Sequence, residues 1–334
     1  MPDLLIALLF FIVLFALELL YFKLAFKYKI IDKPNERSSH SKLTIRGGGI
    51  IFPMAVLSWW VFNDFQHPFF VAGLMLASVI SFMDDINHLH SKVRFLFQFI
   101  AVSLILLQVS LGLPFYWYPL ILIIAIGAIN AWNFMDGING ITGGYSLITI
   151  ASLYYINNQL TAFTENSLLL VVMMALLVFN FFNFRRKARC FAGDVGSVSI
   201  AFIIIFLMIQ AIAATGNFML IGLILLYGLD AVITIIFRII RKENIFEAHR
   251  SHFYQYLANE KGWPHLGVSV LYAGVQGIIN IFIINCYIIY SQNGLNVFPL
   301  LILCLTAGMV FLAIRWVIEG KSRLTNRIEV RASE

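Results

Sequence analysis

The sequence carries little charge for its length. Asp, Glu, Lys and Arg make up 12% of its 334 residues, whereas about 25% is usual for soluble domains. Hydrophobic residues account for 60% of the chain, and the mean hydropathy is +0.87. Because a chain of this length cannot bury so much apolar surface in its own interior, it needs lipid as part of its solvent. The composition excludes a soluble enzyme, a nucleic-acid-binding domain and a secreted disulfide scaffold.

Cysteines are also scarce, and basic residues are missing from the N-terminus. Cys190, Cys286 and Cys304 lie far apart, and two of them fall inside apolar runs. This predicts neither a disulfide framework nor a thiolate metal site. Only Met-Pro-Asp precedes the first apolar run, residues 4–26. Since a signal peptide would begin with Lys or Arg, we expect a retained membrane helix whose N-terminus lies outside.

Long apolar runs occupy most of the chain. A helix needs about 20 residues to cross a bilayer, and polar residues, Gly or Pro separate runs of about this length. The shortest are 47–62 and 140–156. The pattern predicts an all-α polytopic membrane protein with about eleven transmembrane helices. The runs are 4–26, 47–62, 68–83, 93–112, 119–135, 140–156, 167–184, 197–215, 218–240, 267–290 and 297–317.

The Lys and Arg residues fall in five groups, all on one face of an eleven-helix topology. The positive-inside rule assigns that face to the cytoplasm. An odd number of helices places the N-terminus outside and the C-terminus inside. The net charge of +6 then fits loops facing anionic headgroups. We expect one transmembrane domain, residues 1–317, and a cytoplasmic basic tail, residues 318–334. The groups, which hold all 23 basic residues, are 23–46, 92–94, 185–189, 238–261 and 315–331.

Most of the unusual polar residues also lie on the predicted cytoplasmic face, in five segments. In the first, Arg46 precedes three consecutive glycines, Gly47–Gly49, at the start of an apolar run. Glycine leaves the backbone open to a ligand, and a helix N-terminus beside an Arg suits a phosphate group. An ordinary juxtamembrane basic loop is the alternative interpretation.

The second segment carries two adjacent carboxylates, Asp84 and Asp85, at the end of an apolar run. Like charges repel each other, and the C-terminal end of a helix dipole is unfavourable for anions. A solvated helix end therefore explains the pair poorly. We interpret both residues as functional carboxylates that handle a metal ion or a phosphate.

The third segment repeats polar side chains every three positions. Asn133 and Asp136 lie one helical turn apart and share a face, and Asn139 follows at the same spacing. A helix end and a turn would explain the neighbouring Gly137 and Gly140. They would not explain the repeated amide and carboxyl groups, which indicate a polar site at the end of this span.

The fourth segment places Asp194 between Gly193 and Gly196, followed by Ser197. This arrangement predicts an exposed carboxylate beside backbone donors. Mg²⁺ prefers oxygen ligands and usually keeps substrate phosphates among them. Ser197 is also a residue type that caps helices, so the start of a helix explains part of the motif.

The fifth segment, in the longest cytoplasmic loop, contains His249, Arg250 and His252. Two His three residues apart can bind zinc, but no Cys or third ligand is close in the sequence. A nucleotide diphosphate suits these side chains, and a solvated basic loop explains them equally well. Glu18 and Asp230 are acids well inside apolar runs. Such acids are functional candidates by default, and an internal hydrogen bond is the alternative.

The five segments in this order resemble the polyprenyl-phosphate N-acetylhexosamine-1-phosphate transferase superfamily, also called glycosyltransferase family 4. The resemblance covers residues from about 30 to 256 and includes the number of spans. Its specific motifs are Asp84-Asp85, Asn130-x-x-Asn133-x-x-Asp136-Gly137, Gly193-Asp194-Val195-Gly196-Ser197 and His249-Arg250-Ser251-His252.

The resemblance implies roles for individual residues. Asp194 would be the main ligand of a Mg²⁺ ion, or alternatively Mn²⁺, with Asn133 close to the same ion. Asp84 and Asp85 would lie at the diphosphate and the lipid phosphate, one of them acting as a base. Together with Asp194 they form the expected catalytic set. We expect substrate contacts from Arg46, Asp136, Asn139 (which stands where many members carry Asp), His249, Arg250 and His252.

The implied reaction is an attack by an oxygen of undecaprenyl phosphate on the β-phosphorus of a UDP-N-acetylhexosamine, with UMP as the leaving group. The histidine segment resembles the branch that starts O-antigen and related surface polysaccharides, which implies N-acetylglucosamine or a 6-deoxy relative as the sugar. The resemblance further implies a bacterial inner membrane location, with the active site facing the cytoplasm. It implies no nucleic-acid partner and leaves a homodimer open.

Two other classes of function remain as alternatives. One is a transporter or flippase of an anionic lipid or nucleotide sugar, and the other is a non-catalytic scaffold. Transporters usually bind near the bilayer midplane on helices related by internal repeats. Here the acids gather at predicted helix ends and no repeat is visible, which favours the enzyme.

Overall fold

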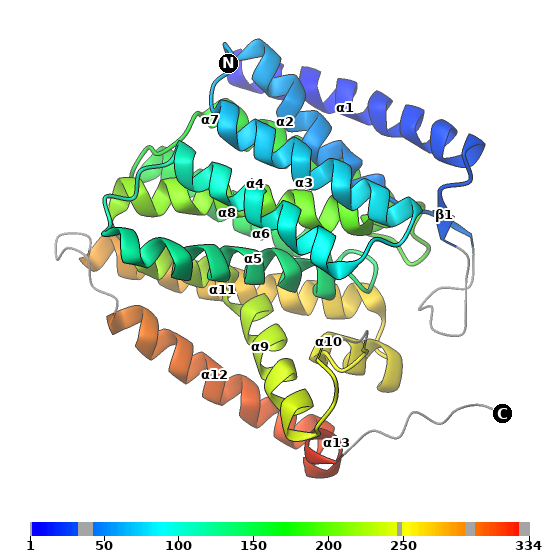
Figure 1. Cartoon of the computed structure of the whole chain (residues 1–334), viewed down its shortest axis with the longest axis vertical. Coiled ribbons are helices and arrows are strands. Elements are labelled where there is room, and N and C mark those ends of the chain that lie inside the picture. The colour runs from blue at the N-terminus through cyan, green and yellow to red at the C-terminus, as the bar shows by residue number, and fades with distance from the viewer. Residues whose placement is uncertain (1, 33–42, 246–248, 291–297, 327–334) are drawn as a thin grey trace.

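The fold is almost entirely helical. The structure, a computed structural model, describes residues 2–32, 43–245, 249–290 and 298–326 (Figure 1). The elements are α1 (Pro2–Lys27), β1 (Ile31–Asp32), β2 (Thr44–Ile45), η1 (Gly48–Ile50), α2 (Ile51–Phe62), α3 (Pro68–Ile86), α4 (Ser91–Gln108), η2 (Phe115–Trp117), α5 (Tyr118–Met135), α6 (Ile141–Gln159), α7 (Asn166–Asn183), α8 (Gly193–Thr215), η3 (Phe218–Ile224), α9 (Leu225–Ile240), α10 (Phe253–Gln255), the π-helical η4 (Tyr256–Glu260), α11 (His265–Tyr290), α12 (Phe298–Glu319) and α13 (Lys321–Thr325).

The expected class, an all-α polytopic membrane protein, is confirmed. Within the described residues, nine helices are long and apolar enough to cross a bilayer. The runs at 47–62 and 140–156 are not among them. α2 has 12 residues and is too short, since about 20 are needed. α6 has 19 residues, but many are polar. The count of eleven therefore stays a prediction.

α8 is the central element of the bundle. Every residue from Val195 to Ile212 is buried, as expected for a helix that is apolar on all sides. It packs against α3, α5, η1 and α6, and Figure 1 shows it in the middle of the bundle. Close approach to η1 requires small residues, because a Cβ on Gly49 would overlap Gly196. The N-terminal end of α8 is thereby fixed among the surrounding loops.

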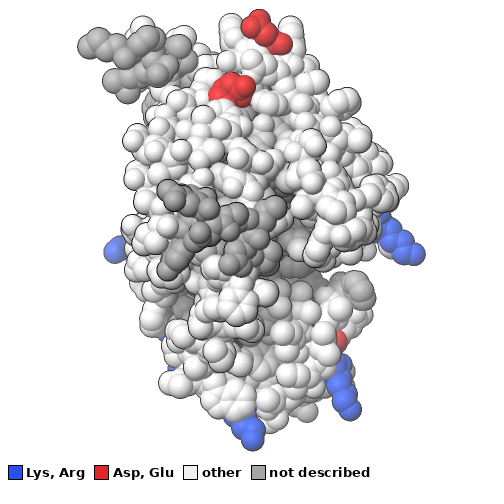
Figure 2. Space-filling view, turned by 90° about the vertical axis from the view of Figure 1, so that its left-hand side faces the viewer, with Lys and Arg blue, Asp and Glu red and all other residues white. Residues whose placement is uncertain are grey.

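Polar contacts between segments distant in the sequence mark two ends of the bundle. At one end, Gly48 N donates to Phe191 O at 2.8 Å. At the other end, Trp59 Nε1 donates to Ser167 Oγ at 2.9 Å, and His67 lies 3.1 Å from Glu165. The described Lys and Arg residues lie at or near the first end, or in the adjoining helices α9, α12 and α13. Figure 2 looks onto the second end, where basic side chains appear only at the outline.

The predicted span 218–240 is not one regular helix. It begins as the 3-10 helix η3 and continues as α9 from Leu225. The break leaves backbone groups that lipid cannot satisfy, and Gln276 satisfies two of them. Its Oε1 accepts Leu226 N at 2.9 Å, and its Nε2 donates to Gly222 O at 3.0 Å. Beyond the break, α9 leaves the bundle and runs to the C-terminal end of α12, beside α13 (Figure 1).

The C-terminal part continues as helix beyond the predicted domain boundary at residue 317. α12 ends at Glu319, and α13 follows after Gly320. Residues 327–334 of the predicted tail lie outside the described residues, as do residues 33–42 of the first basic group.

Candidate active site

Three predicted acids meet where α3 ends and α8 begins. Asp85 Oδ1 accepts the backbone N–H of Asp194, and Asp85 Oδ2 accepts that of Val195, both at 2.9 Å. Asp85 therefore occupies the N-terminal end of α8, where orphan N–H groups and the helix dipole favour an anion. Ser197 does not cap this helix, because α8 already begins at Gly193. Its hydroxyl donates instead to Asn133 Oδ1 at 2.8 Å.

Arg46 also faces this cluster. Its Nε donates to Asp85 Oδ1 at 2.7 Å, and Tyr21 Oη donates to the Arg46 carbonyl at 2.6 Å. The pairing attaches the loop before η1 to the end of α3. Against the opposing effect of its own burial, the charge of Asp85 holds the pKa of Arg46 above its usual value, with a further contribution from Asp194. Arg46 thus stays a cation at the place where the sequence predicts phosphate binding.

The glycines after Arg46 are used for packing. A Cβ on Gly48 would lie 2.6 Å from Cys190 Sγ, and the space beside Gly49 is filled by Gly196. Gly47 adopts a left-handed φ of 75°. The predicted opening of the backbone to a ligand is therefore wrong for Gly48 and Gly49, because neighbouring chain occupies the space that a ligand would need.

Arg94, to which the sequence analysis gave no role, bridges two of the acids. Its Nη1 lies 2.9 Å from Asp84 Oδ2 and 3.5 Å from Asp194 Oδ2. The side chain is 37% exposed, so it can exchange a carboxylate partner for a phosphate. The one feature of the sequence that pointed to Arg94 was its position ten residues after Asp84, in the first turn of the next helix. Asp84, Asp85, Asp194, Arg46 and Arg94 together are called the carboxylate cluster below.

Asp84 and Asp194 touch each other through their carboxyl groups. Two carboxylates in contact need a shared proton or a cation between them. Asn133 Oδ1 accepts the Ser197 hydroxyl at 2.8 Å, and that hydroxyl also lies 3.4 Å from the backbone carbonyl oxygen of Asp194. The described residues contain no group of three or more His, Cys, Asp or Glu arranged to hold a metal ion. The pair offers carboxylate oxygens of the kind that Mg²⁺ takes, since this ion usually uses one or two carboxylates and completes its coordination with water and phosphate oxygens.

Asp136 follows the end of α5 and is half-buried. Burial raises the pKa of its carboxyl group to about 7; the Thr142 hydroxyl and Arg46 oppose the rise, and the charge of Asp85 adds to it. Asp136 interacts electrostatically with Asp85 and Arg46, and Asn133 of the same segment accepts the Ser197 hydroxyl of the fourth segment. The predicted grouping of the second, third and fourth segments is thus present in the structure.

Asn139 has structural partners. Its side-chain Nδ2 donates to Arg185 O at 2.9 Å, and its backbone carbonyl oxygen accepts the Ser269 hydroxyl at 2.8 Å. The neighbouring Gly140 N donates to Asn183 Oδ1 at 2.7 Å. These bonds fasten the turn between α5 and α6 to the chain after α7. The side-chain amide of Asn139 is therefore hydrogen-bonded to the backbone that follows α7.

Residues 249–255, called the histidine loop, lie against the end of α5. Tyr254 Oη donates to Phe134 O at 2.9 Å, and the His252 ring lies over the Phe134 ring with centroids 6.2 Å apart. A Cβ on Gly137 would overlap the Tyr254 hydroxyl. Consecutive α5 residues therefore face different parts of the site, since Asn133 contacts α8 and Phe134 contacts the histidine loop.

The three predicted residues of the histidine loop differ in environment. His252 is buried, His249 is half-buried and Arg250 is exposed. Burial, reinforced by the electrostatic effect of His252 and of the nearby arginines Arg238 and Arg241, lowers the pKa of His249 to about 3. His249 is therefore neutral at physiological pH, and its Nδ1 accepts Ser251 N at 3.3 Å. Arg250 presents its charge to solvent.

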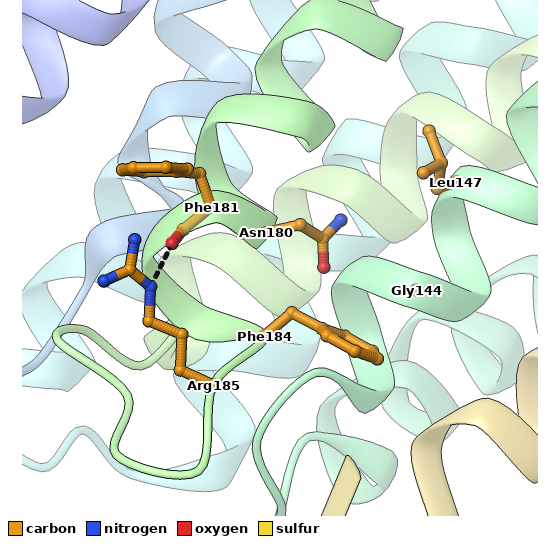
Figure 3. A pocket seen from close by; sticks show the side chains of 6 residues that line it. All are labelled: Gly144, Leu147, Asn180, Phe181, Phe184 and Arg185. Carbon is orange, nitrogen blue, oxygen red and sulfur yellow. Dashed lines mark hydrogen bonds between the residues drawn. The ribbon is translucent and has the colours of Figure 1, made fainter. Parts of the chain in front are cut away.

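A pocket of about 480 Å³ lies beside the turn between α5 and α6, at the ends of α6 and α7. Figure 3 shows Asn180 between the rings of Phe181 and Phe184, with Arg185 bonded to the Phe181 carbonyl. The buried Asn180 Oδ1 has no hydrogen-bond partner among the described residues. The pocket is separate from the carboxylate cluster in its lining residues, which are Gly144, Leu147, Asn180, Phe181, Phe184 and Arg185.

The chain is similar in sequence to known proteins. Residues 67–212 match the sequence model of glycosyl transferase family 4. That stretch contains the acids of the carboxylate cluster, but not Arg46 or the histidine loop. The chain is 27% identical over 272 residues, 75% of each chain, to a probable undecaprenyl-phosphate N-acetylglucosaminyl 1-phosphate transferase of Bacillus subtilis (strain 168).

Two further relatives are named undecaprenyl-phosphate alpha-N-acetylglucosaminyl 1-phosphate transferase. The one from Yersinia pestis is 29% identical over 224 residues, 60% of this chain and 61% of the relative. The one from Escherichia coli (strain K12) is 28% identical over 222 residues, 60% of each chain. The similarity thus spans three quarters of the first relative and about three fifths of the other two.

Proposed function

We propose that the chain is a member of the polyprenyl-phosphate N-acetylhexosamine-1-phosphate transferase superfamily that transfers a sugar 1-phosphate from a UDP-N-acetylhexosamine to undecaprenyl phosphate. An oxygen of the lipid phosphate forms a bond to the β-phosphorus of the nucleotide sugar. The bond from that phosphorus to the bridging oxygen breaks, and UMP leaves with the electron pair. The product is a lipid-linked sugar diphosphate.

The observation that carries this proposal is the carboxylate cluster at the end of a membrane-spanning bundle. Phosphoryl transfer depends mainly on alignment and on neutralising phosphate charge. Arg46 and Arg94 supply two cations within reach of the acids, and both side chains are partly exposed. An acceptor phosphate carried by a lipid anchor would arrive at this end of the helices, where α3 and α8 meet.

The three acids have different partners in the structure, and we infer different roles for them from these partners. Asp85 is committed to the N-terminus of α8 and to Arg46, so it orients the cluster. Asp84 and Asp194 face each other, and we propose that they hold Mg²⁺, or Mn²⁺ in its place, together with Asn133. When bound, such an ion supplies positive charge to the diphosphate oxygens. Arg94, which contacts both acids, places a second positive charge beside the same oxygens.

The histidine loop would contact the diphosphate and sugar. Arg250 is a fixed cation suited to a diphosphate, while Phe253 and Tyr254 are buried and fix the loop. We assign the enzyme to the branch that starts O-antigen and related surface polysaccharides, using N-acetylglucosamine or a 6-deoxy relative. With all basic groups on one face, that face would be cytoplasmic and the membrane the bacterial inner membrane.

A panel assay tests the proposal. Purified protein in detergent is incubated with undecaprenyl phosphate, Mg²⁺ and each of several radiolabelled UDP-sugars, and UMP release and the lipid product are measured. We expect turnover with a UDP-N-acetylhexosamine and none after chelation of divalent ions. A preference for UDP-muramyl-pentapeptide would overturn the branch assignment. Vesicle uptake of the nucleotide sugar without UMP release would support the transporter alternative instead.

A further inference from the structure

Asp230, in α9, is a fully buried carboxylate surrounded by donors. Tyr272 Oη donates to its Oδ2 at 2.6 Å, and Thr234 Oγ1 donates to its Oδ1 at 3.1 Å. The backbone N–H groups of Phe253 and Tyr254 donate to it at 3.0 and 3.4 Å. The carboxylate therefore accepts the N–H groups of the first two residues of α10, and these hydrogen bonds hold the second half of the histidine loop.

Arg315, in α12, holds the other half. It is fully buried, although most of α12 is exposed on the surface of the bundle. Its Nη2 donates to the carbonyl of Ser251 at 3.0 Å, and its Nη1 donates to Thr234 Oγ1 at 2.7 Å and lies 3.8 Å from Asp230. Its Nε pairs with Glu319 at 2.5 Å. An arginine from the membrane-facing helix thus reaches into the histidine loop.

His252 lies between these two attachments. The carbonyl before it is bound by Arg315 and the N–H groups after it are bound by Asp230. The His252 ring is 2% exposed, and its Nδ1 lies 3.4 Å from Asp230 Oδ1. Neither ring nitrogen of His252 has a hydrogen-bond partner among the described residues, although Nδ1 lies within ion-pair distance of Asp230. A buried polar atom without a partner is costly, which points to a partner that arrives with the substrate.

We propose that Asp230 and Arg315 are positioning residues that hold His252 so that its Nε2 contacts the diphosphate–sugar half of the donor. The inference rests on the proposed function. A buried ion pair is by itself a poor source of stability, since desolvation offsets much of the attraction. A carboxylate at one ring nitrogen instead fixes the orientation of the other, as it does for histidines that bind metals. α12 thereby becomes part of the donor site.

The central test removes both buried charges together. The double variant Asp230→Asn/Arg315→Gln shortens the Arg315 side chain, keeps a polar group at both positions and leaves neither partner as an unpaired charge. We expect the KM for the UDP-sugar to rise about tenfold, which corresponds to about 1.4 kcal/mol. The KM for undecaprenyl phosphate and the inhibition constant of UMP should stay within about twofold. UMP lacks the β-phosphate and sugar, so it does not reach His252.

A milder variant covers the case in which the double variant does not fold. Tyr272→Phe removes one hydrogen bond to Asp230 and keeps the ring. We expect the KM for the UDP-sugar to rise about threefold, again without a change for UMP. The matched control is Glu165→Gln, which breaks the pair with His67 at the opposite end of the bundle. It should lower the melting temperature without changing either KM.

The outcomes separate the inference from the proposed function. If the wild-type protein does not turn over any UDP-sugar, the proposed function fails. If it does, and folded variants keep the wild-type KM for the UDP-sugar, the positioning role is wrong. The role is also wrong if the variants weaken UMP and the UDP-sugar equally, or if Glu165→Gln reproduces the change.

Discussion

Asp85 holds Asp194 in place through the backbone: its carboxylate accepts the N–H of Asp194 at 2.9 Å, at the first turn of α8. The two acids belong to different predicted motifs, yet one is a structural support for the other. A Cβ on Gly193 would lie 2.6 Å from Asp85 Oδ2, so the glycine allows this approach. The side chain of Asp194 remains directed to Asp84 and Arg94. Asp85 and Asp194 should therefore respond differently to the same substitution.

The first prediction compares those two acids. Asp194→Asn removes the charge proposed to hold Mg²⁺ but keeps size, so we expect UMP release to be abolished with expression and melting temperature near wild type. Asp85→Asn removes an anion from a helix N-terminus and from Arg46, so activity and stability should both fall, the latter by about 2 kcal/mol. UMP release and thermal unfolding of the purified variants measure the two effects.

This assignment of different roles to Asp194 and Asp85 is contradicted if Asp194→Asn lowers the rate of UMP release only a few-fold. Such a result would move the metal away from Asp194, most simply toward Asp84 and Asp85. Equal destabilisation by both substitutions would show that Asp194 also supports the fold. Mg²⁺ titration of the wild-type rate provides the control, because the ion must be required before its ligand is sought.

The second prediction concerns Arg94. Replacing it with Gln removes the cation that contacts Asp84 and Asp194, and we expect kcat/KM to fall at least about tenfold, since a charge-assisted contact to phosphate is lost. Arg94→Lys should keep part of the activity. Lys92→Gln is the matched control, because Lys92 is an exposed cation two residues earlier in the same helix turn. An equal effect of both substitutions would indicate a general loss of positive charge.

Hydropathy and charge spacing predicted the helical class and the gathering of the polar segments. They could not predict the break at Leu225, because the residue that satisfies it, Gln276, lies on α11 and η3 is as apolar as the rest of the run. Length and hydropathy alone also led us to count the run at 47–62 as a transmembrane helix, although α2 has only 12 residues. Features that depend on a distant partner are invisible in the local pattern.

The site shows the same limit. Adjacent acids and Gly-flanked Asp194 stand out in an apolar chain, so their grouping was predictable. Arg94 did not stand out, since basic residues at a membrane boundary are ordinary. Arg315 was detectable as an arginine inside an apolar run, but its partner Asp230 is on another helix. Asn139 has the residue type of a binding group, and its backbone partners depend on the path of the chain after α7.

The third prediction is a pH dependence of stability. The pKa of Asp136 is about 7 in the folded protein and 3.8 for the free side chain. Between these values the folded state holds a proton that the unfolded state has lost, so stability falls as pH rises. This contribution is complete below about pH 4 and lost above about pH 7. For one group, the slope is at most about 1.4 kcal/mol per pH unit.

Asp136→Asn removes this titration and keeps the neutral shape. Melting temperatures of both proteins are measured from pH 5 to pH 8, and their difference is plotted against pH. We expect the wild-type protein to lose stability relative to the variant as pH rises. A constant difference would show that Asp136 ionises as freely in the folded protein as in the unfolded one.

The fourth prediction fixes the orientation of the bundle. The one-sided distribution of Lys and Arg predicts a cytoplasmic C-terminus. A fusion at residue 334 to a reporter active only in the cytoplasm should therefore be active. A fusion truncated at Gly112, in the connection between α4 and η2, should be active with a periplasmic reporter instead. Periplasmic activity at residue 334 would require an even number of spans and would change the assignment of the loops.

The last prediction tests the contact that joins the histidine loop to α5. Gly137 leaves room for the Tyr254 hydroxyl, which donates to Phe134 O at 2.9 Å. Gly137→Ala would place a methyl group where that hydroxyl lies, so the loop must shift away from the end of α5. Because α8 contacts the other side of α5, through the hydrogen bond from Ser197 to Asn133, we expect the KM for the UDP-sugar to rise by about tenfold or more while the protein stays folded.

A matched control and a rescue separate this clash from a general effect of adding a methyl group. Gly127→Ala lies on α5 with nothing within 4 Å of the new Cβ, and replacing a helical glycine by alanine should leave activity unchanged and stability equal or higher. In Gly137→Ala/Tyr254→Phe the overlapping oxygen is gone and the nearest ring carbon lies 3.1 Å away. The double variant should therefore recover part of the lost affinity for the UDP-sugar. If Gly137→Ala binds the UDP-sugar as tightly as the wild-type protein, the contact between Tyr254 and the end of α5 does not position the histidine loop.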